Sequence, residues 1–95
     1  MELKKIKVGR KTIVGLTLPL QTKNLIVLRG AKGYIMCGYL DMNAADKFND
    51  VAIKVTGVST IEDALAATAV SVSRAAVSLG VSPGQPIREV LEIIA

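Results

Sequence analysis

The first half of the chain alternates apolar and polar residues in the way that half-buried β-strands do. Five segments are predicted to form strands: residues 2–8, 12–18, 25–28, 34–40 and 51–55. Gly9-Arg10 suits a two-residue hairpin turn between the first two, because glycine allows positive φ. Gly38 inside the fourth segment predicts a bulge or a close backbone approach. The short connection before the fifth strand leaves its parallel or antiparallel orientation open.

The second half changes to the three- and four-residue spacing that is typical of helices. Asn43 is predicted to cap a short helix that runs through Phe48. Residues 59–62, Ser-Thr-Ile-Glu, form a capping box that predicts the start of a long helix. This helix is predicted to end at Gly80, which supplies a left-handed exit. A last helix is predicted from one apolar stripe: Ile87, Val90, Leu91 and Ile94.

The predicted long helix is apolar on both sides. Its main stripe recurs every three or four residues: Ile61, Leu65, Ala69, Val72, Ala76 and Leu79. Its opposite side is also apolar: Ala66, Ala67, Val70 and Val77. A helix that is apolar all round is buried, so we expect it to lie between the sheet and a second body. That body would be the last helix or a neighbouring subunit.

Strands come first along the chain and helices later, which is the order of an α+β fold. We therefore predict a two-layer sandwich. Its mostly antiparallel, five-stranded sheet is expected to carry one short helix and two C-terminal helices packed on one face. The chain of 95 residues can form one hydrophobic core and is too short for two, so residues 1–95 are predicted to be a single domain.

The composition is 51% hydrophobic, with one Phe, two Tyr and no Trp. The predicted core is therefore aliphatic, built from Ile, Val, Leu and Ala. A high apolar share in a small chain leaves apolar surface uncovered after folding, and such surface favours self-association. Together with the apolar back of the long helix, this predicts a homo-oligomer.

No segment has the pattern of a membrane span or an export signal. The longest weakly polar stretch, residues 64–80, contains Arg74, and the apolar residues near the amino end are interrupted at Gly9. Cys37 is the only cysteine and can form no internal disulfide. We therefore expect a cytoplasmic protein without membrane contact.

The net charge of +4 is unevenly distributed along the chain. Residues 1–40 carry eight Lys and Arg against one Glu, whereas residues 41–95 carry four against seven acidic residues. This asymmetry permits a surface that binds nucleic acid non-specifically, and it equally permits a solvated basic face. Base recognition on a sheet also needs exposed aromatic residues, and Tyr34 and Tyr39 point to opposite faces of one predicted strand. Nucleic acid is therefore the less favoured partner.

Three stretches of the chain resemble one known family. Residues 33–41 read Gly-Tyr-Ile-Met-Cys-Gly-Tyr-Leu-Asp, residues 58–65 read Val-Ser-Thr-Ile-Glu-Asp-Ala-Leu, and residues 80–84 read Gly-Val-Ser-Pro-Gly. In this order they are similar to the YunC-like family of small bacterial and archaeal domains. The resemblance implies a compact two-layer α/β sandwich. It implies no established activity and carries over no catalytic residue, because the family is itself classed as a domain of unknown function.

Cys37 is the only residue that could act as a thiol nucleophile. A reactive thiolate usually needs a base nearby, and the chain has no histidine. Asp41 lies on the same predicted strand face, but four residues at ~3.3 Å each place it about 13 Å away. A buried structural cysteine is the simpler interpretation, because free cysteine is among the most buried residue types. A ligand contact or a redox role is the alternative.

The sequence predicts neither a metal site nor a cofactor. Asp41, Asp46 and Asp50 could offer oxygen ligands to magnesium or calcium, but no calcium-loop spacing is present. Helix capping and solubility explain these residues more simply. Residues 29–33, Arg-Gly-Ala-Lys-Gly, lack the spacing of both common phosphate-binding motifs, so we interpret them as a turn.

The favoured function is a homo-oligomeric interaction or small-ligand-binding domain without catalysis. An enzyme or redox protein that uses Cys37 with Asp41 or a lysine in a cleft is the first alternative. A basic accessory protein that binds nucleic acid non-specifically is the second. Any site is expected near Cys37, Tyr39 and Asp41, with Lys32 and Thr60 as outer contributors.

Overall fold

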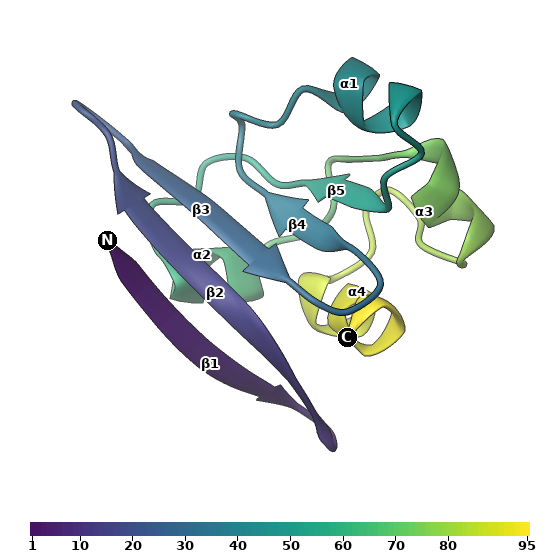
Figure 1. The fold of residues 1–95 in the computed structure, drawn as a ribbon, viewed down its shortest axis with the longest axis horizontal. Coiled ribbons are helices and arrows are strands. Elements are labelled where there is room, and N and C mark those ends of the chain that lie inside the picture. Colours follow the sequence, from purple (N-terminus) through teal and green to yellow (C-terminus); the bar gives the residue numbers. More distant parts are fainter.

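A single sheet of six strands runs through the molecule, in the order β1-β2-β3-β4-β5-β6. Figure 1 shows β1 to β5 side by side. The computed structural model describes residues 1–95. The strands are β1 (Glu2–Val8), β2 (Lys11–Pro19), β3 (Asn24–Arg29), β4 (Tyr34–Met36), β5 (Ala52–Lys54) and β6 (Ser71–Val72). Neighbouring strands are antiparallel except β4 and β5, which are parallel. The α+β class is confirmed, with six strands in place of the five expected.

The first three strands form as predicted. β1 and β2 pair from Glu2 opposite Thr17 to Val8 opposite Lys11. Gly9 has a φ of 61°, which is the left-handed conformation that the predicted hairpin turn requires. β3 then pairs antiparallel with β2 along its whole length.

The fourth strand is shorter than predicted and ends at Met36. The chain turns there, and the amide of Leu40 donates to the carbonyl oxygen of Cys37. Gly38 lies in this turn, and an added Cβ would meet no atom within 4 Å. The bulge or close approach predicted for Gly38 is therefore wrong, because the residue lies beyond the end of the strand.

Helix α1 (Met42–Lys47) connects β4 to β5. Its N-cap is Asp41, whose carboxylate accepts from the amide of Ala44 at 3.2 Å. The predicted cap, Asn43, is wrong because it lies within the first turn. Asp41 holds the capping position because its side chain reaches the amide three residues further along the chain.

The predicted long helix over residues 59–79 is wrong. The segment folds as α2 (Ile61–Leu65), β6 and α3 (Arg74–Ser78). The amides of Val70 and Ser73 donate to carbonyl oxygens of β5, so the middle of the segment pairs with the sheet edge. The alternating β-branched residues Thr68, Val70 and Val72 favour such an extended backbone.

The cap of α2 lies one residue further along the chain than predicted. Thr60, and not Ser59, caps α2 by accepting from the amide of Asp63 at 3.0 Å. The carboxylate of Asp63 in turn accepts from the amide of Ser59 at 3.0 Å. The arrangement resembles a capping box, except that the Asp63 side chain binds the amide of the residue before the cap and not that of the cap itself.

The last helix, α4 (Ile87–Ile94), forms as predicted. Its four stripe residues are each at most 3% exposed: Ile87, Val90, Leu91 and Ile94. They belong to the main core with α2 and the inner face of the sheet. α2 lies behind β2 and β3 in the view of Figure 1 and also contacts α4. The core is aliphatic, as the composition predicts.

Helix α1 packs on the opposite face of the sheet. Ala52 and Ile53 are consecutive in β5 and therefore point to opposite faces. Ile53 belongs to the main core, whereas Ala52 packs with Leu40 and Ala45 of the α1 region. The expectation that all helices cover one face is therefore wrong for α1. None of the helices is both long and apolar enough to cross a membrane.

Ser73 is the one buried polar residue, and it joins three parts of the fold. Its hydroxyl donates to the carbonyl oxygen of Asp50 at 2.6 Å. The same oxygen accepts from the amides of Ala52 at 3.0 Å and Ala76 at 3.2 Å. One hydroxyl therefore caps α3 and holds the start of β5.

Replacing Ser73 by alanine should lower the free energy of unfolding by about 3 kcal/mol, because buried backbone groups would lose their partner. Urea unfolding followed by circular dichroism measures this difference. Ser78→Ala is the matched control: this exposed hydroxyl donates to the carbonyl oxygen of Arg74, and its loss should change stability by less than about 0.5 kcal/mol. Equal effects of the two substitutions would contradict the role given to Ser73.

Candidate functional site

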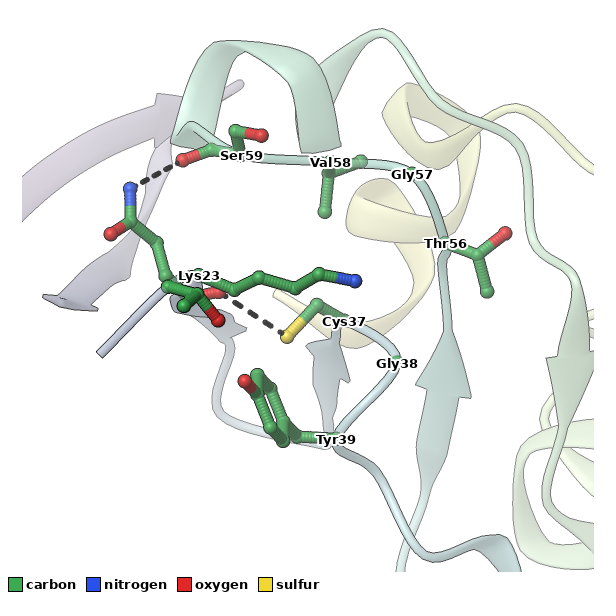
Figure 2. A pocket seen from close by; sticks show the side chains of 10 residues that line it. Lys23, Cys37, Gly38, Tyr39, Thr56, Gly57, Val58 and Ser59 are labelled. Carbon is green, nitrogen blue, oxygen red and sulfur yellow. Dashed lines mark hydrogen bonds between the residues drawn. The ribbon is translucent and has the colours of Figure 1, made fainter. Parts of the chain in front are cut away.

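A cleft with a volume of about 650 Å³ opens at one end of the sheet. It opens where the turn before β3, the turn after β4 and the loop before α2 come together (Figure 2). Ten residues line it: Thr22, Lys23, Asn24, Cys37, Gly38, Tyr39, Thr56, Gly57, Val58 and Ser59. These three segments are far apart in the chain, and the pairing of β3, β4 and β5 brings them to one end of the sheet.

Cys37 forms part of the cleft wall and is only 4% exposed. Its sulfur accepts from the amide of Ile26 at 3.4 Å and lies 4.0 Å from the carbonyl oxygen of Asn24, to which the thiol donates. The thiol is therefore held by backbone groups of β3. Neither a histidine nor a carboxylate lines the cleft.

Two side chains give the cleft its chemical character. Lys23 is the one charged residue in the lining, and its side chain extends across the cleft in Figure 2. Tyr39 is 51% exposed and presents its ring at the rim. The Nδ2 of Asn24 donates to the carbonyl oxygen of Ser59 at 2.9 Å and closes one end. The arrangement offers a cation, a ring and backbone polar groups to a small ligand.

The structure brings together only part of the predicted site. Cys37 and Tyr39 line the cleft, and Thr60 directly follows the lining residue Ser59. The hydroxyl of Thr60 is engaged as the cap of α2. Asp41 caps α1 and does not line the cleft.

Lys32 lies elsewhere. It lines a second hollow of about 370 Å³ around the turn between β3 and β4. Gly33 is required in this turn, because a Cβ there would come within 2.5 Å of the Val51 side chain.

Most of the lining residues outside the segment 37–39 are not predicted by the sequence pattern. Lys23 and Asn24 come from a polar turn, and nothing local connects that turn to Cys37. The loop residue Gly57 was likewise not predicted. Gly57 has a φ of 70°, and a glycine between two strand-like segments is the one signal that could have indicated a shaped loop there.

Tyr34 and Asp50 form the polar centre of the second hollow. The phenol of Tyr34 donates to Oδ2 of Asp50 at 2.9 Å. Burial, the hydrogen bond to Asp50 and the charge of Asp50 raise the pKa of Tyr34 from 10.0 to about 12. The neutral phenol is therefore the form that the folded chain stabilises.

A family model for a domain of unknown function, DUF1805, matches residues 36–94, which include most of the cleft lining. The chain belongs to this family. The protein YunC of Bacillus subtilis (strain 168), described as uncharacterised, is 34% identical to this family member over 95 residues. The alignment covers 96% of this chain and 94% of YunC. The predicted resemblance to the YunC-like family is therefore confirmed.

A solved structure supports the same assignment for this DUF1805 domain. The crystal structure of TA1206, a protein of unknown function from Thermoplasma acidophilum, matches with a TM-score of 0.95 and 35% sequence identity. The match covers 99% of this chain and 92% of that chain. The family is thus established together with its fold, and its function is uncharacterised, as the resemblance implied.

The raised pKa of Tyr34 predicts a loss of stability at high pH. Because the unfolded value is 10.0 and the folded value about 12, the stabilising contribution is complete below pH 10 and disappears as the pH rises through about 12. Urea unfolding between pH 9 and 12 should show this decline, and it should be smaller in Tyr34→Phe. In Tyr39→Phe, Tyr34 is the remaining tyrosine, and its tyrosinate absorbance should appear near pH 12. Ionisation near pH 10 in that folded variant would contradict the assignment.

Proposed function

We propose that this domain binds a small anionic molecule in the Cys37 cleft without transforming it. The observation that carries the proposal is the charge of the lining: Lys23 is its one cation, and no carboxylate opposes it. The volume of about 650 Å³ lies within the range of ordinary small-ligand sites. We include a cytoplasmic location in the proposal, since the only cysteine can form no internal disulfide.

The remaining lining groups support a ligand with an anionic head and a flat body. An anion near Lys23 could accept further hydrogen bonds from the hydroxyl-bearing residues Thr22 and Ser59. The half-exposed ring of Tyr39 offers a face against which a planar group can stack. Val58 points into the cleft in Figure 2 and provides an apolar contact.

A thiol enzyme that uses Cys37 is the less favoured alternative. The sulfur is almost fully buried and is held by the Ile26 amide and the Asn24 carbonyl. Of the partners considered from the sequence, Asp41 does not line the cleft, whereas a lysine, Lys23, does. Lys23 and Tyr39 are the remaining groups with proton-transfer chemistry in the lining, and neither is bonded to the Cys37 sulfur, so binding without catalysis fits the arrangement better.

Self-association is a second proposal. It rests on the apolar composition and on large apolar side chains that remain exposed in the single chain. They are Met1, Leu3, Leu20, Tyr39, Phe48, Val70, Val77 and Leu79. The apolar back of the predicted long helix gives no support to self-association, because that helix does not form.

Ligand binding in the cleft can be followed by amide chemical shifts during titration with benzoate, and with benzamide as its uncharged analogue. Benzoate should shift the amides of residues 37–39 and 56–59, and benzamide should do so at higher concentration. Lys23→Ala should weaken benzoate binding about tenfold, the loss expected for one charge-assisted hydrogen bond. Gly38→Val should also weaken it, because the space beside Gly38 is open and a side chain there narrows the cleft.

Lys32→Ala is the matched control for the loss of one cation, because Lys32 lines the other hollow. It should leave benzoate binding unchanged. The proposal fails if benzoate produces no saturable shifts at the cleft, or if Lys32→Ala and Lys23→Ala weaken binding equally.

Self-association predicts a solution mass above the 10.0 kDa of one chain. Sedimentation equilibrium across the micromolar range should show a mass that rises with protein concentration. A mass of one chain at every concentration would rule this second proposal out and would leave the ligand-binding proposal standing.

A further inference from the structure

One face of the sheet is left without a cover over β1, β2 and β3. Residues directly opposite each other in paired strands point to the same face. Leu3 pairs with Leu16, Leu16 with Val27, and Val27 with Met36, so these four side chains form one row across four strands. α2 and α4 cover the other face, and α1 covers this face only near β4 and β5.

The uncovered part of this face, which we call the open face, is apolar at its centre. Its apolar residues are Leu3, Val14, Leu16, Leu18 and Val27. Leu3 is 64% exposed, and the other four are half-buried. None of the five belongs to either core cluster or packs against one. The open face is thus an apolar surface without a partner inside the chain.

Cations surround the apolar centre. Lys5 and Arg29 pair with Val14 from either side, and Lys7 pairs with Thr12. Lys54 pairs with Met36 at the far end of the leucine row. No acidic residue of the six strands shares this face, because the one acidic strand residue, Glu2, pairs with Thr17 on the opposite side. None of the four cations forms an ion pair.

We propose that the open face binds an acidic amphipathic helix of another protein, with an apolar stripe on the leucine row and carboxylates against the cations. Charge complementarity selects this occupant, because a second copy of the chain would bring its own four cations to the same interface. A membrane surface is less favoured, because peripheral sites usually insert protruding aromatic residues. Tyr34 is the one aromatic residue of the six strands, and its hydroxyl is bound to Asp50, whereas the exposed Phe48 lies at the end of α1 and outside the open face.

The size of the open face suits one helix. Three strands at a spacing of ~4.8 Å give a strip about 14 Å wide, and a helix with its side chains is about 10–12 Å across. α1 already occupies the same layer above β5. An incoming helix would therefore extend the layer that α1 begins and bury the leucine row as α2 and α4 bury the other face.

Two synthetic helical peptides of about 18 residues test the proposal. Both carry leucines along one face; one carries glutamates beside them and the other lysines at the same positions. Fluorescence anisotropy should show that the glutamate peptide binds at least about tenfold more tightly. Its affinity should fall as salt is raised, since the contacts between charges are exposed.

Leu16→Glu, at the centre of the open face, should weaken binding of the glutamate peptide at least about tenfold. Val77→Glu is the matched control, because Val77 is 55% exposed on α3 and its substitution should have no effect. Lys5→Glu with Lys7→Glu changes only exposed side chains, which keeps the test valid if Leu16→Glu fails to fold. This double variant should abolish the preference between the two peptides, because it leaves two carboxylates against the two remaining cations, Arg29 and Lys54.

Four results would overturn the proposal. Equal affinity for the two peptides would remove the electrostatic argument, and so would an unchanged preference in the Lys5 and Lys7 variant. A solution mass above one chain that Leu16→Glu reduces to one chain would assign the open face to a second copy. Binding to phosphatidylserine vesicles that depends on Leu16, without peptide binding, would assign it to a membrane surface.

Discussion

The pairing of residues 70–73 with the edge of β5 is the constraint on which the second half of the fold depends. It divides what would otherwise be one helix into α2, β6 and α3. The hydroxyl of Ser73 fixes the junction, because it bonds to the backbone of both β5 and α3. The carbonyl oxygen of Ala69, just before these residues, also accepts from Gly84, so the same stretch of chain aligns the approach to α4. The main core is assembled around this edge.

The sequence predicts the parts of the fold that depend on local spacing. The hairpin of β1 and β2 and the buried stripe of α4 both follow from periodicity and one turn residue. The prediction of one helix over residues 59–79 is wrong because the same apolar spacing also fits a chain that is buried on several sides. β6 has two residues, which is too short to show an alternating pattern. Its backbone partners lie in β5, and no local feature of the sequence reports them.

In the candidate site, too, local sequence predicts some residues and long-range pairing brings in the others. Cys37 and Tyr39 are neighbours in the chain and were found together, whereas Lys23 approaches them only because β3 and β4 are paired. Asp41 was expected to share a face with Cys37 along a seven-residue strand. That strand stops at Met36, and Asp41 instead satisfies an amide at the start of α1. Residue type identified the chemistry, and long-range strand pairing decided which residues meet.

The order of the strands across the sheet repeats their order along the chain. No strand therefore has to enter between two strands that are already paired, and the sheet can grow from β1 by addition at a single edge. The first three additions join neighbours through short turns, which keeps the loop-closure entropy small. The later strands are joined to the sheet through longer segments that contain α1 and α2. This topology lets the amino-terminal meander form early during synthesis, before the residues that complete the core have been made.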